Sequence, residues 1–149
     1  MKVGGKSYKL KVVYYDDEST PSRASQLTER LVKQDGVEFM LGPYSTTMTK
    51  AVAPVTEKYK VPMVEAEGAS RSLFTQGYKY MFAVLSTSEY YLAPVLDLIA
   101  QRAKADGKKP SDLRIGMAFE NDGFSLDVRA GVLDVAKKHG MKIVIDDKL

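Results

Sequence analysis

The sequence contains no cysteine, no tryptophan and a single histidine, His139. Without cysteine there can be no disulfide framework and no thiolate zinc site. The absence of cysteine is compatible with a protein of the reducing cytosol and with an exported protein. No apolar run approaches the roughly 20 residues that a membrane-spanning helix needs, and residues 1–6 lack the apolar stretch of a signal peptide. The 22 basic and 19 acidic side chains give a net charge of +3 spread along the chain, so a nucleic-acid partner is not expected.

The composition, 44% apolar and 28% charged, is that of an ordinary globular domain. Short apolar runs alternate with segments whose apolar residues recur every three or four positions, which predicts strands separated by helices. Such an order indicates β–α–β units and an α/β fold with parallel sheets. The expected strands are residues 8–15, 37–41, 61–64, 80–85, 113–119 and 141–145. The expected helices run between Thr20 and Gly36, over 47–59, over 87–104 from a Ser86-x-x-Glu89 capping box, and over 124–139 up to Gly140.

A Gly-Pro turn and a row of hydroxyls, GPYSTT at residues 42–47, follow the predicted strand 37–41 directly. Ser45 and Thr46 would then lie at the start of the next helix, where unpaired backbone N–H groups and the helix dipole attract an anion. These features suit a carboxylate. The alternative is that a hydroxyl only caps its own helix. Neither of the glycine-rich phosphate-binding motifs is present, so a nucleotide ligand is disfavoured.

Residues for catalysis or metal binding are scarce. His139 falls in the last turn of a predicted helix, where it cannot complete a Ser-His-Asp triad. Asp16 and Asp17 follow a predicted strand and could hold Mg²⁺, or they could simply form a solvated strand end. We therefore expect no catalytic residue, no metal and no cofactor. Among the aromatic residues, Tyr44 and Phe124 are the candidates for ligand contact because both lie at strand-to-helix junctions.

Two strand-end segments share the pattern Glu-x-acid-Gly-x-Ser: EAEGAS at residues 65–70 and ENDGFS at residues 120–125. Chance can produce a match of this length. The match is also expected if two similar α/β lobes each present a strand-end loop to a shared crevice.

Four stretches in this order resemble the type I periplasmic binding proteins of the branched-chain amino acid group, the ligand-binding receptors of ABC transporters. They are GGKSYKLKVVYYDDESTPSRA, GPYSTTMTKAVAPVTEKYKVPMV, TQGYKYMF and RIGMAFENDGFSLDVRAG. The resemblance implies two Rossmann-like lobes with parallel sheets, joined by a hinge and closing on a small molecule. Since family members are more than twice this length, both lobes would be incomplete. Residues 1–85 would belong to the N-terminal lobe, without its first strand and helix, and residues 86–149 to the C-terminal lobe.

The resemblance also implies where a ligand binds. The hydroxyl loop and the loop after the next strand would hold the ligand's carboxylate, and an aromatic residue of the other lobe would cover it. Glu67 and Ala69 replace a small residue and a threonine that are usual there, which adds a negative charge and removes a hydroxyl. Phe124 replaces the usual tyrosine and favours a hydrophobic or aromatic acid. The predicted ligand-binding residues are Tyr44, Ser45, Thr46, Glu67, Gly68, Ala69 and Phe124.

These observations favour a non-enzymatic solute-binding protein that takes up a small carboxylate-bearing ligand, an amino acid or an aromatic or hydrophobic acid. It would act in the periplasm or outside the cell and deliver its ligand to a membrane permease. One alternative keeps the fold and makes the chain the ligand-sensing ectodomain of a signalling receptor. Another is a flavodoxin-like phosphoryl-transfer domain that uses Asp16 and Asp17. Because incomplete lobes leave parallel strands unpaired, we also expect a homodimer formed through exposed sheet edges.

Overall fold

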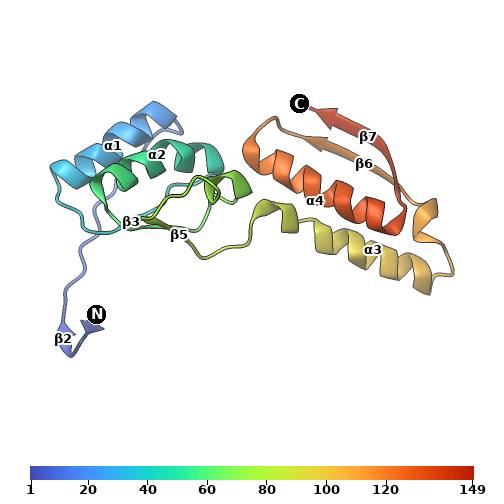
Figure 1. The fold of residues 1–149 in the computed structure, drawn as a ribbon, viewed down its shortest axis with the longest axis horizontal. Helices are drawn as coiled ribbons and strands as arrows, with labels where there is room; N and C mark the ends of the chain where they lie inside the picture. The colour runs from blue at the N-terminus through green and yellow to red at the C-terminus, as the bar shows by residue number, and fades with distance from the viewer.

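The computed structural model describes residues 1–149 and contains three separate sheets. A short antiparallel hairpin, β1 (Lys2–Val3) and β2 (Lys6–Ser7), projects at the N-terminus (Figure 1). The other two sheets are parallel, which confirms the α/β prediction. In Figure 1 they form a left-hand and a right-hand part of the molecule, joined by the segment that leads into α3. No helix is both long and apolar enough to cross a bilayer.

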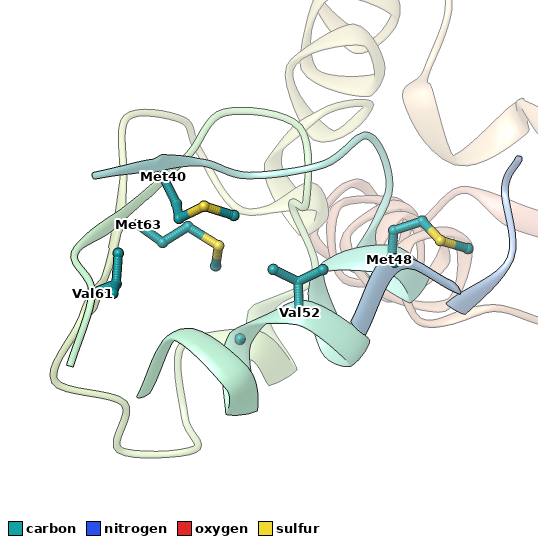
Figure 2. Close-up of a cluster of buried hydrophobic side chains, with 7 residues drawn as sticks. Met40, Met48, Val52, Val61 and Met63 are labelled. Carbon is teal, nitrogen blue, oxygen red and sulfur yellow. The ribbon is translucent and has the colours of Figure 1, made fainter. Parts of the chain in front are cut away.

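The left-hand sheet has the order β3-β4-β5, with strands at Met40–Leu41, Met63–Glu65 and Met81–Ala83. Met40 and Met63 lie opposite each other on the face that meets α2 (Thr46–Tyr59), where they pack around Val52 (Figure 2). α1 (Pro21–Lys33) lies beside α2 (Figure 1). The core of this part is therefore a layer between one sheet face and two helices.

The opposite face of the same sheet is uncovered. Leu41, Val64 and Phe82 occupy one row across the three strands, and all three side chains are exposed. Parallel sheets in proteins are usually covered on both faces. The row is therefore an apolar surface without a partner in this chain.

Residues 8–15 do not form the strand that their composition predicts. They run without strand pairing, and Val13 and Tyr15 are half-buried while Val12 and Tyr14 are exposed, so the alternation expected of a strand is present. A strand needs hydrogen bonds from a neighbour. Tyr8 bonds to Met1 next to the N-terminal hairpin, but residues 9–15 make no backbone–backbone hydrogen bond within the chain.

The right-hand part consists of the parallel pair β6 (Arg114–Phe119) and β7 (Lys142–Lys148), with α3 (Ala93–Ala105) and α4 (Gly123–His139). Gly140 ends α4 in the left-handed conformation with φ 69°, as predicted. Its core contains Leu96, Ala100, Val132, Ala136 and Met141.

The prediction of one long helix over residues 87–104 is wrong for its first part. The chain forms a 3-10 turn, η2 (Ser88–Tyr90), and α3 starts only at Ala93. Pro94 explains the break, because a proline has no N–H to bond back along a continuous helix and is accommodated in a first turn. The capping box does not form either: Thr87, not Ser86, precedes the turn as its N-cap and makes no side-chain cap hydrogen bond, and Glu89 Oε2 has no hydrogen-bond partner.

The 3-10 turn η2 connects the two parts and packs against both. Ser88 N–H donates to the carbonyl oxygen of Ala69 at 2.9 Å, which ties the turn to the left-hand part. On the other side, the Glu89 backbone lies so close to Gly131 of α4 that a Cβ at position 131 would overlap the Glu89 carbonyl oxygen. Gly131 therefore permits the approach of α4 to the turn.

Candidate functional site

The start of α2 provides unpaired donors. Ser45 is the N-cap, and its hydroxyl accepts the Met48 N–H at 3.3 Å. The N–H groups of Thr46 and Thr47 donate no hydrogen bond within the chain, as expected for a first turn. Ser45 adopts φ 79° and ψ 152°, a conformation that is nearly confined to glycine. The helix therefore begins on a strained residue with free donors beside it.

The loop after β4 lies against this turn. Thr46 Oγ1, which is buried, accepts the Ser70 N–H at 3.2 Å and keeps its own hydrogen for another acceptor. The N–H groups of Glu67 and Gly68 both donate to Glu65 Oε1 at 2.6 Å. The Ala69 N–H, in contrast, donates to nothing within the chain. The two segments together leave three backbone N–H groups without a hydrogen-bond partner, on Thr46, Thr47 and Ala69. Thr47 is exposed, whereas Thr46 and Ala69 are buried, with 3% and 0% exposure.

The start of α4 faces the same corner from the right-hand part. Asp122 caps α4 by accepting the Phe124 N–H at 2.6 Å. A Cβ built on Gly123 would lie 3.5 Å from Thr46 Cγ2 and 3.3 Å from Ser70 Oγ. The two strand-end segments that share a sequence pattern, 65–70 and 120–125, therefore meet in the structure.

A carboxylate of α4 closes this junction. Asp127 Oδ2 accepts hydrogen bonds from Ser70 Oγ and from the Arg71 N–H, both at 2.8 Å. Residues on opposite sides of η2 thus contact each other directly where the resemblance places the ligand.

Phe124 lines a separate apolar hollow. Its ring meets Tyr91 edge-on, with centroids 5.5 Å apart and planes at 78°. The hollow has a volume of about 250 Å³ and is also lined by Met117, Val128 and Val132. An aromatic, mostly apolar wall therefore stands beside the polar corner.

Tyr44 is placed differently from the other predicted ligand-binding residues. Tyr44 is 78% exposed and lines a hollow of about 1010 Å³ between residues 8–17, α1 and β3. That hollow is the larger of the two and lies under the unpaired segment. Neither hollow is lined by Thr46, Thr47 or Ala69. Glu67 is adjacent to the corner, and its side chain is exposed. The structure therefore brings together Ser45, Thr46, Gly68 and Ala69, sets Phe124 next to them, and leaves Tyr44 outside.

Four residues of this corner were not predicted from the sequence: Lys50, Glu65, Ser70 and Asp127. Lys50 Nζ would be 3.1 Å from a Cβ on Gly123, so it also reaches the junction. A signal existed for Glu65, a charged residue at the end of a buried strand, and for Ser70, the last residue of the shared pattern. Lys50 and Asp127 lie inside helices, where no local signal marks them.

The other candidates are used for structure. Asp16 and Asp17 each accept a backbone N–H two residues on, at 2.8 Å, and no group of three possible metal-binding side chains is present. His139 Nε2 lies 2.6 Å from Asp97 Oδ1, and Lys138 also donates to this carboxylate. The pKa of Asp97 is lowered mainly by the hydrogen bond with His139 and further by the hydrogen bond with Lys138.

The chain matches the protein-family model described as "Periplasmic binding protein" over residues 1–149. It is 26% identical over 125 residues to Leu/Ile/Val-binding protein homolog 8 of Brucella abortus, covering 83% of this chain and 31% of the relative.

Solved structures show the same fold. A solute binding protein of an ABC transporter from Rhodopseudomonas palustris BisB5, in complex with 3,4-dihydroxy benzoic acid, superposes with a TM-score of 0.81 at 20% identity. The superposition covers 95% of this chain and 36% of the solute binding protein. A second solute binding protein from R. palustris, in complex with 4-hydroxybenzoate, superposes with a TM-score of 0.76 at 25% identity. This superposition covers 92% of this chain and 34% of the second protein. The chain spans about a third of the length of these relatives.

Proposed function

The chain belongs to the periplasmic binding protein family, and from this premise we propose that it is a solute-binding component of an ABC transporter. Its ligand is a small carboxylic acid held between an N-terminal lobe, residues 1–85, and a C-terminal lobe, residues 86–149. The observation that carries the proposal is the corner where the start of α2 and the loop after β4 leave three backbone donors unused.

A carboxylate fits these donors. Its two oxygens can accept from the exposed Thr47. They can also accept from the buried Ala69 and from the N–H and unused hydroxyl hydrogen of the buried Thr46 once the corner opens to a ligand. The dipole of α2 adds a partial positive charge at the same place. The strained backbone of Ser45 supports a binding role, because strain of this kind is concentrated at ligand sites.

The body of the ligand meets an apolar wall. Phe124 and Tyr91 contact each other edge to face and provide a surface on which a ring or a branched alkyl chain packs. The relatives point to the same two ligand types, since one is named for leucine, isoleucine and valine and another holds 4-hydroxybenzoate. The ligand is a hydrophobic amino acid or an aromatic acid. Phe124, which carries no hydroxyl, favours the aromatic acid.

The Thr46→Val variant tests the site by isothermal titration with 4-hydroxybenzoate and with leucine. The variant keeps the shape of the side chain. It removes both the hydroxyl donor and the acceptor of the Ser70 N–H, so its dissociation constant should rise on the order of tenfold. Thr56→Val is the matched control, because Thr56 is a buried threonine of the same helix whose hydroxyl bonds to the Ala53 carbonyl oxygen at 3.0 Å. The proposal fails if wild type releases no heat with either ligand, or if both variants bind equally well.

We further propose that the protein acts in the periplasm or outside the cell, passes its ligand to a membrane permease and catalyses no reaction. These properties are supported by the family and by its transporter relatives.

We also propose that two copies associate through exposed edges of the left-hand sheet. β3 and β5 are its edge strands, each with one side unpaired in the sheet. The exposed row of Leu41, Val64 and Phe82 adds apolar surface on the adjoining face of the sheet. The mass of the chain in solution, measured by light scattering, tests this association. A monomer of 16.5 kDa at every concentration would refute it.

A further inference from the structure

We propose that Glu65 is a positioning and specificity-determining residue of the ligand corner. Its buried carboxylate is an internal anion that orders the loop after β4 and restricts the site to ligands with a singly charged head group. This inference rests on the proposed function, because it concerns the same site.

Glu65 is fully buried and entirely engaged within the chain. Oε1 accepts the N–H groups of Glu67 and Gly68 at 2.6 Å each, and Oε2 lies 2.8 Å from Thr49 Oγ1. No lysine, arginine or histidine pairs with it. A buried carboxylate without a cationic partner is uncommon and is retained where its hydrogen bonds serve a purpose.

The surroundings are shaped for this carboxylate. Gly42 follows β3 directly, and a Cβ at this position would overlap Glu65 Oε2 and lie 2.7 Å from Glu65 Cδ. Only glycine fits beside the carboxylate, which gives a physical reason for the glycine that opens the GPYSTT stretch. Thr49 Oγ1 also lies 2.8 Å from the Ser45 carbonyl oxygen, so the same hydroxyl connects Glu65 to the N-cap of α2.

This arrangement decides which donors a ligand can use. The Glu67 and Gly68 N–H groups are already bonded to Glu65, so they are not offered to the ligand. The turn that they form leaves the Ala69 N–H free and brings the Ser70 N–H to Thr46. Glu65 therefore sets the positions of the donors that remain.

The charge of Glu65 has a separate effect on ligand choice. A negative side chain beside the first turn of α2 offsets part of the helix dipole and repels a second anion. A carboxylate brings one negative charge to the corner, whereas a phosphonate of the same shape brings two when fully ionised. Repulsion by Glu65 should weaken the doubly charged head group more.

The test compares 4-hydroxybenzoate with 4-hydroxyphenylphosphonate by isothermal titration, at a pH where the phosphonate carries two charges. Glu65→Gln retains the hydrogen bonds, because the amide oxygen accepts both N–H groups and the amide nitrogen donates to Thr49 Oγ1. The Thr49 hydrogen then goes to the Ser45 carbonyl oxygen. We expect this variant to bind both acids more tightly, the doubly charged phosphonate more than 4-hydroxybenzoate. The preference for 4-hydroxybenzoate over the phosphonate should therefore fall on the order of tenfold.

Glu65→Ala removes the hydrogen bonds as well as the charge and should weaken binding of both acids. Glu57 gives a matched control, since its Oε2 accepts the N–H groups of Lys79 and Tyr80 at 2.9 and 3.0 Å, far from the corner. Glu57→Gln should leave the preference unchanged.

If Glu65→Gln has the same preference as wild type, the inference is overturned while the proposed function stands. If wild type binds neither 4-hydroxybenzoate nor the phosphonate, both are overturned.

Discussion

Gly131 allows a sharp test of how the two parts of the molecule are joined. It lies in the middle of α4, where alanine would ordinarily stabilise the helix by about 1 kcal/mol relative to glycine. In this structure a Cβ at position 131 would overlap the Glu89 carbonyl oxygen and lie 2.7 Å from its carbonyl carbon and 3.1 Å from its Cα. These are backbone atoms, so no change of rotamer relieves the overlap, and overpacking of this kind costs about 1–3 kcal/mol.

Because the overlap is with backbone atoms, its cost should lie at the upper end of that range, about 3 kcal/mol. Less the gain of about 1 kcal/mol from helix propensity, the expected result for Gly131→Ala is a net loss of about 2 kcal/mol in the free energy of unfolding. Urea unfolding followed by circular dichroism measures this difference. Ala130→Gly, at the exposed neighbouring position of α4, is the control and should lose about 1 kcal/mol through propensity. A Gly131→Ala variant as stable as wild type, or more stable, would refute the close packing of η2 on α4.

Two further changes test other contacts. Gly42→Ala should destabilise the chain by about 1–3 kcal/mol because of the overlap with Glu65, and much of this loss should disappear in a Glu65→Ala background, since the space is then free. Additive losses in that double-mutant cycle would contradict the contact. Arg129 donates to Asp146 at 2.8 Å, and this hydrogen bond lowers the pKa of Asp146 below its usual value near 3.8. The stability it contributes is therefore present above that value and is lost as the pH falls through the lower folded-state value. Asp146→Asn should flatten the acid side of the stability curve in urea melts taken at several pH values, and an unchanged curve would speak against the pair.

Features determined by local sequence were predictable. Pro21 begins α1 and Gly140 ends α4 because their backbone preferences act at the residue itself. The alternation of strands and helices also indicated parallel sheets, which the structure contains. Pro94 was a local signal as well, and its effect in delaying α3 was missed.

Features that depend on distant contacts were not predictable. Residues 8–15 have the composition of a strand, but pairing requires a neighbour that composition does not supply. Glu65 reads as the polar end of a strand, and its role depends on Gly42 and Thr49, which lie elsewhere in the sequence. The junction with Asp127 joins residues more than fifty positions apart, beyond the reach of any local pattern.

The most direct measurement of the central claim is an amide chemical-shift titration of the wild-type chain with 4-hydroxybenzoate. A carboxylate at the proposed corner should move the amide signals of Thr46, Thr47 and Ala69 strongly. The amides of Glu67 and Gly68 should move little, because they remain bonded to Glu65. Shifts confined to the residues that line the 1010 Å³ hollow, or no shifts at all, would contradict the claim.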